Sequence, residues 1–185
     1  MRLYIGLVHY PVYNKNNQTI ASAITTIDLH DIARVARTYD VKRFFVITPL
    51  EDQQMLAERV KKHWIQGYGA SYNTLRKEAI ELVTVVSNLR GALDAVTDME
   101  QEPPLLIATD ASSQKNRNIS YENARRLIQD GTVAILVFGT AWGLEKGILD
   151  RADYVLDPIF GRAGYNHLSV RTAAGIILDR LVGRC

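Results

Sequence analysis

The feature that most constrains the fold is the alternation of short apolar, β-branched runs with amphipathic stretches along the whole chain. The apolar runs predict buried strands at residues 3–8, 43–48, 81–86, 105–110, 133–139 and 153–157. Helical patterns separate them, near residues 27–38, 51–64, 88–100, 120–129, 143–150 and 167–181. This order predicts an α/β fold with a mostly parallel sheet and helices on both faces.

Length and composition limit the class of protein. The 185 residues suffice for one well-buried core and fall short of two independent domains, so we expect a single domain over residues 1–185. No apolar run could span a bilayer and no signal-peptide pattern is present, which predicts a soluble cytoplasmic protein without membrane contact. The only cysteine, Cys185, excludes a disulfide within one chain. The net charge of +2 is too small to require a nucleic-acid partner.

Three loops are the candidate binding segments, because ligands of open parallel sheets bind beyond the carboxyl ends of the strands. These loops follow the fourth, fifth and sixth predicted strands and read TDASSQKN, FGTAWGLEKG and LDPIFGRAGYNHLS. Their small residues let backbone amides approach a ligand, although tight strand-to-helix turns explain the glycines equally well. The second loop lacks the lysine and hydroxyl residue of a P-loop, which argues against a triphosphate site. Trp142 in this loop could cover a flat or apolar ligand.

Other chemistries have little support in the sequence. The four histidines show no metal-ligand spacing, so we expect no metal site; they are His9, His30, His63 and His167. No G-x-S-x-G motif marks a nucleophilic serine. His9, at the end of the first predicted strand, is read as a packed histidine with one hydrogen bond.

The second and third loops resemble known motifs. FGTAWGL (138–144) and LDPIFGRAGYNHLSVRTAAGIILDRL (156–181) resemble the second and third motifs of the SPOUT superfamily of S-adenosylmethionine-dependent RNA methyltransferases. The opening LVHYPVYNKNNQTIASAITTIDLHDIARVARTYDVKRFFVITP (7–49) resembles the small stand-alone bacterial branch of that superfamily, so the resemblance covers nearly the whole chain. It implies an enzyme that transfers a methyl group from S-adenosylmethionine to a nucleotide of tRNA or rRNA. It also implies a deep trefoil knot in the carboxyl-terminal segment, which general topology rules would exclude.

In that fold the three loops form one pocket, and the methyl donor binds bent inside it. Asn166 is also read as a cap for the last helix, and backbone groups near Ile159 and Leu168 are implied to meet the adenine edge. The residues implied to bind the donor are Thr109, Asp110, Ala111, Phe138, Gly139, Thr140, Trp142, Gly143, Leu144, Leu156, Pro158, Ile159, Gly161, Tyr165, Asn166, His167, Leu168 and Ser169.

The stretch DLHDIARVARTYDV (28–41) resembles the first SPOUT motif, in which an asparagine precedes an arginine by six residues. Arg34 matches the arginine, which is implied to contact RNA phosphate or to assist at the reacting atom. Asp28 stands at the asparagine position, and Asp28 and His9 are the candidates for acid–base catalysis. On the predicted helix, Ile27 belongs to the apolar side, whereas Asp28 and Arg34 lie toward the other side. The alternative for Arg34 is a surface arginine paired with Asp31.

The resemblance also bears on Ala141, on the oligomeric state and on two alternative functions. Ala141 departs from the glycine of the branch, which could crowd the ligand or stiffen the loop. We expect a homodimer, because the pocket of one subunit leaves the RNA site open until a second subunit supplies a wall. The interface would use the helix near 167–181 and the first motif. The rivals are a SPOUT-fold donor- or RNA-binding module without transferase activity, and a flavodoxin-like nucleotide-binding regulator, which leaves NHLSVR unexplained.

Overall fold

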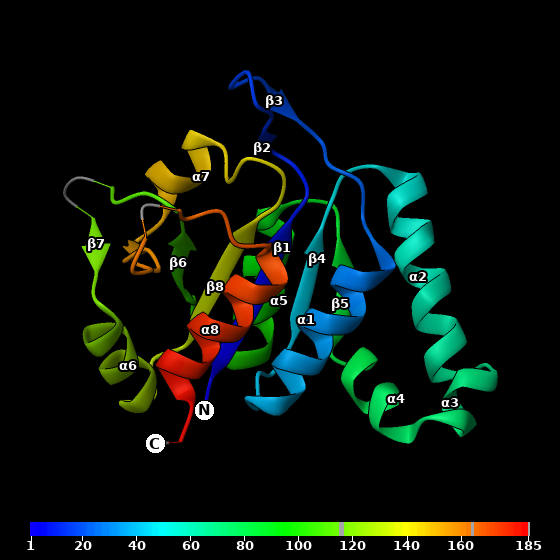
Figure 1. The fold of residues 1–185 in the computed structure, drawn as a ribbon. Helices are drawn as coiled ribbons and strands as arrows, with labels where there is room; N and C mark the ends of the chain where they lie inside the picture. Colours follow the sequence, from blue (N-terminus) through cyan, green and yellow to red (C-terminus); the bar gives the residue numbers. More distant parts are fainter. Residues whose placement is uncertain (115–116, 164, 185) are drawn as a thin grey trace.

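The computed structural model describes residues 1–114, 117–163 and 165–184 (Figure 1). Cys185, to which the disulfide expectation refers, lies outside these residues, as do Lys115 and Asn116 of the first candidate loop. Within the described ranges, seven parallel strands form one sheet in the order β5-β4-β1-β8-β6-β9-β7. The strands are β1 (Leu3–Val8), β4 (Phe44–Ile47), β5 (Val83–Val86), β6 (Leu105–Thr109), β7 (Asn118–Ile119), β8 (Ala134–Gly139) and β9 (Tyr154–Leu156). All six predicted strands are therefore confirmed.

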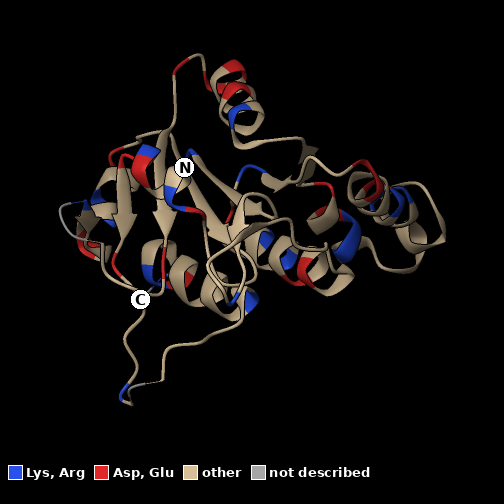
Figure 2. Ribbon diagram, turned by 90° about the horizontal axis from the view of Figure 1, so that it is seen from above, with Lys and Arg blue, Asp and Glu red and all other residues tan. Residues whose placement is uncertain are grey.

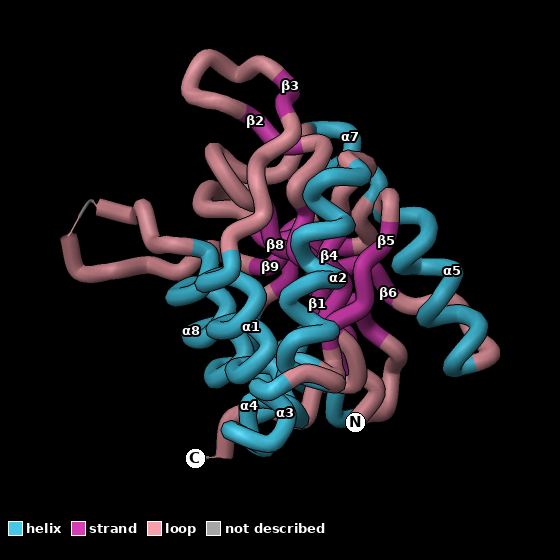
Figure 3. The backbone as a smooth tube through the Cα atoms, turned by 90° about the vertical axis from the view of Figure 1, so that its right-hand side faces the viewer, coloured by secondary structure: helices cyan, strands magenta, loops and turns pink. Residues whose placement is uncertain are grey.

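Helices cover both faces of the sheet, as the alternating pattern predicts. Side chains of α1 (Thr26–Thr38), α2 (Glu51–Ile65), α4 (Thr74–Ile80), α6 (Tyr121–Gln129) and α8 (Val170–Val182) join the core on one face. On the other face the core includes α5 (Leu89–Glu100) and α7 (Lys146–Arg151). Figure 3 shows α5 on the opposite side of the strands from α1, α2 and α8.

The central strand β1 shows why the strands read as continuous apolar runs. All its residues are buried, and it pairs with β4 on one side and β8 on the other. Leu3, Ile5 and Leu7 contribute to the core beneath α1 and α8, whereas Tyr4 and Val8 contribute to the core beneath α5. Both faces of this strand must therefore be apolar, because helices exclude water from each.

The structure adds elements that the sequence pattern did not predict. The chain after β1 forms an antiparallel hairpin of β2 (Val12–Tyr13) and β3 (Thr19–Ile20), and α2 is followed by the short α3 (Tyr68–Tyr72) and by α4. Two helices also begin later than predicted. The residues before α7 form a tight turn, and α8 begins at Val170 because the hydroxyl of Ser169 accepts a hydrogen bond from the Thr172 amide.

The carboxyl-terminal helix α8 returns to the centre of the fold, where it packs against α1 and β8. Residues 157–163 and 165–169, which precede α8, extend outward beyond the start of this helix (Figure 3). In the part of the chain that the structure describes, no helix combines the length and apolar character needed to cross a membrane.

Candidate functional site

The three candidate loops lie at one edge of the sheet, as predicted from the carboxyl ends of their strands. They leave β6, β8 and β9, and β6 is hydrogen-bonded to both of the other two strands. The Asn166 side-chain amide donates to the carbonyl oxygen of Ala111 at 2.7 Å, which ties the third loop to the first. The prediction that Asn166 caps the last helix is wrong, because Ser169 takes that position and Asn166 bridges the loops instead.

The second loop turns too tightly for ordinary side chains at several positions. A Cβ on Gly139 would stand 2.6 Å from the Leu144 amide nitrogen, and Gly143 has a φ of +103°. Ala141 has a φ of +52°, a left-handed conformation that costs a non-glycine residue about 1–2 kcal/mol. The turn requirement therefore explains Gly139 and Gly143, and it places Ala141 in a conformation that glycine adopts without this cost.

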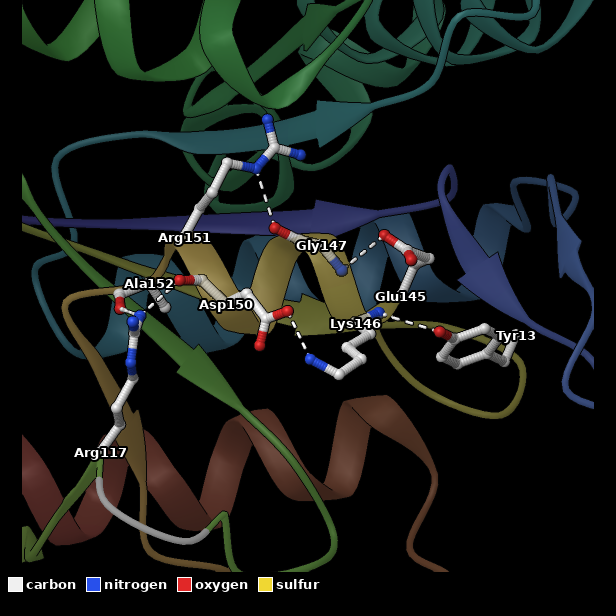
Figure 4. Close-up of polar contacts among 8 residues, drawn as sticks. All are labelled: Tyr13, Arg117, Glu145, Lys146, Gly147, Asp150, Arg151 and Ala152. Carbon is white, nitrogen blue, oxygen red and sulfur yellow. Dashed lines mark hydrogen bonds and ion pairs between the residues drawn. The ribbon is translucent and has the colours of Figure 1, made fainter.

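Contacts at both ends hold this second loop in place. Tyr13 of the hairpin receives a hydrogen bond from the Trp142 amide and donates its own amide to the Gly143 carbonyl, both at 3.0 Å. At the start of α7, the Glu145 carboxylate accepts from the Gly147 amide at 2.7 Å, and the Tyr13 hydroxyl accepts from the Lys146 amide at 3.1 Å (Figure 4). The loop is thus braced by the amino-terminal hairpin.

Trp142 is the most distinctive side chain of this loop. Its backbone is fixed by the hairpin, yet 67% of the residue is exposed, so the indole is no part of the core. Beside it, the position of a Cβ on Gly143 has no heavy atom within 4 Å. An exposed aromatic ring next to open space at a glycine offers a flat ligand both a cover and a close approach to the backbone.

The predicted donor-binding residues divide by exposure. Phe138, Thr140, Leu144, Leu156 and Pro158 are buried, so their side chains serve the core and their backbones shape the loops. Exposed members are Ala111, Trp142, Gly161, Tyr165, His167, Leu168 and Ser169, and half-buried members are Thr109, Asp110, Gly139, Gly143, Ile159 and Asn166.

The polar side chains of the first loop satisfy one another. The Thr109 hydroxyl donates to the Val137 carbonyl at 3.0 Å. The Asp110 carboxylate accepts from the Ser112 amide and from the Gln114 side chain, each at 2.8 Å. Asp110 is therefore fixed by its own loop. Among the described residues, no group of three or more His, Cys, Asp or Glu is placed to hold a metal ion.

His9 is a packed histidine, as predicted, and connects the first strand with the second loop. It is fully buried, and its Nδ1 lies 3.0 Å from the Ser22 hydroxyl oxygen, which in turn hydrogen-bonds the Thr140 hydroxyl. Its Nε2 is buried without a partner in the described structure. Burial lowers the pKa of His9 to about 4, although the nearby Asp28 carboxylate partly offsets this effect. The imidazole is therefore neutral near pH 7.

Asp28 is buried against the last helix, contrary to the prediction that it lies on the outer side of its own helix. It accepts a hydrogen bond from the Thr25 hydroxyl at 2.6 Å and forms an ion pair with Arg171 of α8. The apolar Ile27 is 58% exposed instead. A buried carboxylate requires a cation, and Arg171 supplies it.

Arg171 is the site residue that sequence reasoning missed. Its guanidinium group contacts Asp28 and also lies 3.5 Å from the Asp31 carboxylate, so it joins α8 to two acidic residues of α1. One signal was available in the sequence, since aspartate at a position usually held by asparagine requires a new positive partner. Spacing alone could not show which of the distant cations this was.

Arg34 is exposed on α1, and the described residues provide no ion-pair partner for its side chain. The alternative pairing with Asp31 is not formed among the described residues, where the Asp31 carboxylate lies 3.5 Å from the Arg171 guanidinium group. The structure thus leaves the guanidinium group of Arg34 available to a ligand from outside the chain.

The sequence also matches a known family of methyltransferases. A family described as SAM-dependent RNA methyltransferase matches residues 2–183, so the chain belongs to this family and its methyl donor is S-adenosylmethionine. The resemblance seen in the sequence is confirmed.

Individual relatives agree with the family. The chain is 42% identical over 181 residues to the "tRNA (guanine-N(1)-)-methyltransferase" of Oleidesulfovibrio alaskensis, covering 98% of this chain and 42% of that protein. It is 36% identical over 183 residues to an uncharacterized protein of Aquifex aeolicus, covering 98% and 89% of the two chains. The chain therefore spans less than half of the first relative.

Among solved structures, the SpoU methyltransferase AviRb from Streptomyces viridochromogenes in complex with AdoMet superposes with a TM-score of 0.57 at 16% identity. The match covers 97% of this chain and 58% of AviRb. At this identity it establishes the shared fold.

We predict that His9 makes the stability of the protein depend on pH. The unfolded imidazole titrates near 6.5 and the folded one near 4, so the unfolded state binds more protons between these values. The contribution of His9 to the free energy of unfolding is complete above pH 6.5. It is lost as the pH falls toward 4, and the loss amounts to up to about 3 kcal/mol. Denaturant unfolding of a His9→Asn variant should show a flatter pH profile, whereas replacement of the exposed His63 should not; equal profiles would contradict the prediction.

We predict that Arg171→Ala destabilises the protein by about 1–3 kcal/mol, because it leaves the Asp28 carboxylate buried without its cation. The partial exposure of Arg171 keeps the loss below that of a fully buried pair. The double variant Arg171→Ala/Asp28→Asn should recover much of the lost stability, because the amide of asparagine needs no counter-charge. Arg90→Ala, which breaks an exposed pair with Asp94, is the control and should cost less than about 1 kcal/mol. Additive losses in the double variant would show that the two residues are not coupled.

Proposed function

We propose that this chain methylates a nucleotide of tRNA, with S-adenosylmethionine as the methyl donor. The observation that carries the proposal is the convergence of the three motif loops at the edge formed by β8, β6 and β9, with Arg34 unpaired on the adjoining helix. The name of the Oleidesulfovibrio relative supports tRNA over rRNA. The guanine N1 atom is not carried over, because more than half of that relative has no counterpart in this chain.

The residues present fit such a donor. The open position at Gly143 lets a ligand approach the backbone, and the exposed indole of Trp142 can cover its flat base. When bound, the donor supplies an electrophilic methyl group on a sulfonium. Methyl transfer of this kind depends mainly on alignment, which suits a site of rigid loops with few titratable groups.

The chain's own residues divide the remaining tasks in this proposal. Arg34 binds a phosphate of the RNA and fixes the position of the target nucleotide. Asn166 holds the first and third loops together around the donor. His9 and Asp28 are buried and engaged, so we assign them positioning roles: His9 supports Thr140 through Ser22, and Asp28 anchors α8 through Arg171.

Two crossed variants test the proposal. Arg34→Ala should lower methyl transfer from labelled donor to tRNA at least about tenfold, or roughly 1.4 kcal/mol, with unchanged donor affinity in calorimetry. Trp142→Ala should instead weaken donor binding, by about 1–3 kcal/mol. Arg34→Lys should restore activity only in part, since an ammonium group cannot make a two-pronged phosphate contact.

The outcomes separate the roles of the two residues. Absence of donor binding at millimolar concentration would refute the enzyme as proposed. Equal turnover by the wild type and Arg34→Ala would refute the role of Arg34 alone. Donor and RNA binding without methyl transfer would favour the rival, a module that lacks its own transferase activity.

We further propose that the working form is a homodimer. Residues 157–163 and 165–169 extend beyond the body of the subunit and carry strongly exposed aromatic rings, with Phe160 and Tyr165 each 72% exposed. Ile27, at the start of α1, is 58% exposed, so apolar surface lies near both predicted interface helices. A second subunit would bury this surface and complete the wall of the RNA site.

We predict that light scattering at micromolar concentration shows a dimer, and that Phe160→Ser/Tyr165→Ser shifts it toward monomer, because the exposed aromatic surface would no longer be buried. Tyr10, 43% exposed, provides a control substitution at another site. A fully active wild-type monomer would contradict the prediction.

The trefoil knot and the cytoplasmic location belong to the same proposal. Three observations support a threaded carboxyl-terminal segment. The strand β9 lies between β6 and β7, the helix α8 packs against α1, and the Asn166 side chain donates a hydrogen bond to the Ala111 carbonyl oxygen. A tRNA substrate implies that the protein works in the cytoplasm.

A further inference from the structure

The basic residues of the chain are unevenly distributed. Five of its 22 Lys and Arg residues lie within residues 59–77, and none of its 20 Asp and Glu residues does. The rest of the chain is therefore net negative, although the whole chain carries +2. This segment forms the second half of α2, then α3 and the start of α4, and we call it the α2–α4 arm.

The arm presents two stacked tyrosine rings to solvent. Tyr68 and Tyr72 lie with ring centroids 5.8 Å apart and planes inclined by 25°. They are 74% and 72% exposed, and the neighbouring Leu75 is 75% exposed. Aromatic rings of this size are normally covered, so an exposed stacked pair indicates a surface that receives a flat partner.

The cations of the arm differ in whether they have a counter-charge. Lys61 pairs with Glu58, and Lys77 approaches Glu81 at 3.8 Å. Arg59 and Lys62 are exposed, and the described residues give them no ion-pair partner. Both line a shallow groove along α2 together with Met55, Ile65, Gln66 and the paired Glu58 and Lys61. Figure 2 shows the change along α2 from acidic residues at its start to basic residues further on.

The arm packs against α1 through the ring of Trp64. His30 of α1 packs edge-on against the ring of Trp64, and the Arg76 guanidinium lies over that ring, 4.6 Å from its centroid. Burial lowers the pKa of His30, and the charges of Arg76, Arg34 and His63 lower it further. Trp64 therefore joins α2 to His30 of α1 and to Arg76 of α4.

We propose that the α2–α4 arm is an RNA-docking surface, on which Tyr68 and Tyr72 stack with unpaired bases while Arg59 and Lys62 contact phosphates. The proposal rests on RNA as the substrate of the proposed function and adds a second point of attachment, separate from the donor loops. Aromatic stacking beside unpaired cations is the usual chemistry of single-stranded nucleic acid binding.

A second copy of the chain fits this surface less well than RNA does. A two-fold interface would bring the arm against its own counterpart, so the unpaired cations of both subunits would face one another. Phosphates, in contrast, supply the missing negative charge, and the bases supply the flat partner for the rings.

The test measures binding of tRNA, with donor product present, as a function of salt concentration. Arg59→Gln/Lys62→Gln should weaken binding at least about tenfold at low salt and reduce the slope of log K against log salt by about 1–2. Tyr68→Ala/Tyr72→Ala should weaken binding about five- to hundredfold and leave the slope unchanged. The control, Arg90→Gln/Arg126→Gln, removes two exposed arginines from α5 and α6 and should change little.

All these side chains are exposed or partly exposed, and unchanged melting temperature and donor affinity would confirm that the variants fold. Ultraviolet cross-linking of tRNA to the unmodified protein should also label Tyr68 or Tyr72, which needs no variant.

The result separates this inference from the proposed function. If the wild type binds no RNA, the proposed function fails and the docking surface with it. If RNA binding depends on Arg34 while both arm variants match the control, the docking surface is overturned and the function stands. If the arm variants change only the oligomeric state, the surface is a protein interface and the inference is overturned.

Discussion

The whole arrangement depends on parallel pairing around β1. The strand β1 is buried on both faces and pairs in parallel with β4 on one edge and β8 on the other, and both neighbours are apolar. Parallel strands place their carboxyl ends at one edge, so the loops that follow Thr109, Gly139 and Leu156 become neighbours although they are distant in the chain. The binding site therefore follows from the sheet and does not require each loop to fold independently.

Charge pairing then links the last helix to this framework. The Asp28–Arg171 contact joins residues 143 positions apart in sequence and fixes the start of α8 against α1. The same arginine lies 3.5 Å from the Asp31 carboxylate, so it engages two acidic residues in the first half of α1.

Much of the fold could be predicted from the sequence because long apolar runs carry a strong signal. The two-residue strands of the hairpin and the five-residue α3 were missed, since elements so short show no periodicity. The burial of Asp28 was missed for another reason: it depends on Arg171, and a contact across the fold leaves no trace in local spacing. At the site, residue spacing identified the three loops. The hydrogen bonds from Tyr13 to the second loop and from Asn166 to the first loop could be seen only in the folded structure.

The course of α2 has a consequence for the size of a substrate. This helix begins at the edge that carries the donor loops and ends at the opposite edge, where α3 follows. Its 15 residues correspond to a length of about 22 Å. A ligand that touches both ends must span that distance, which a single nucleotide cannot do. A substrate that uses both surfaces would therefore have to extend along α2, from the edge with the three candidate loops to α3.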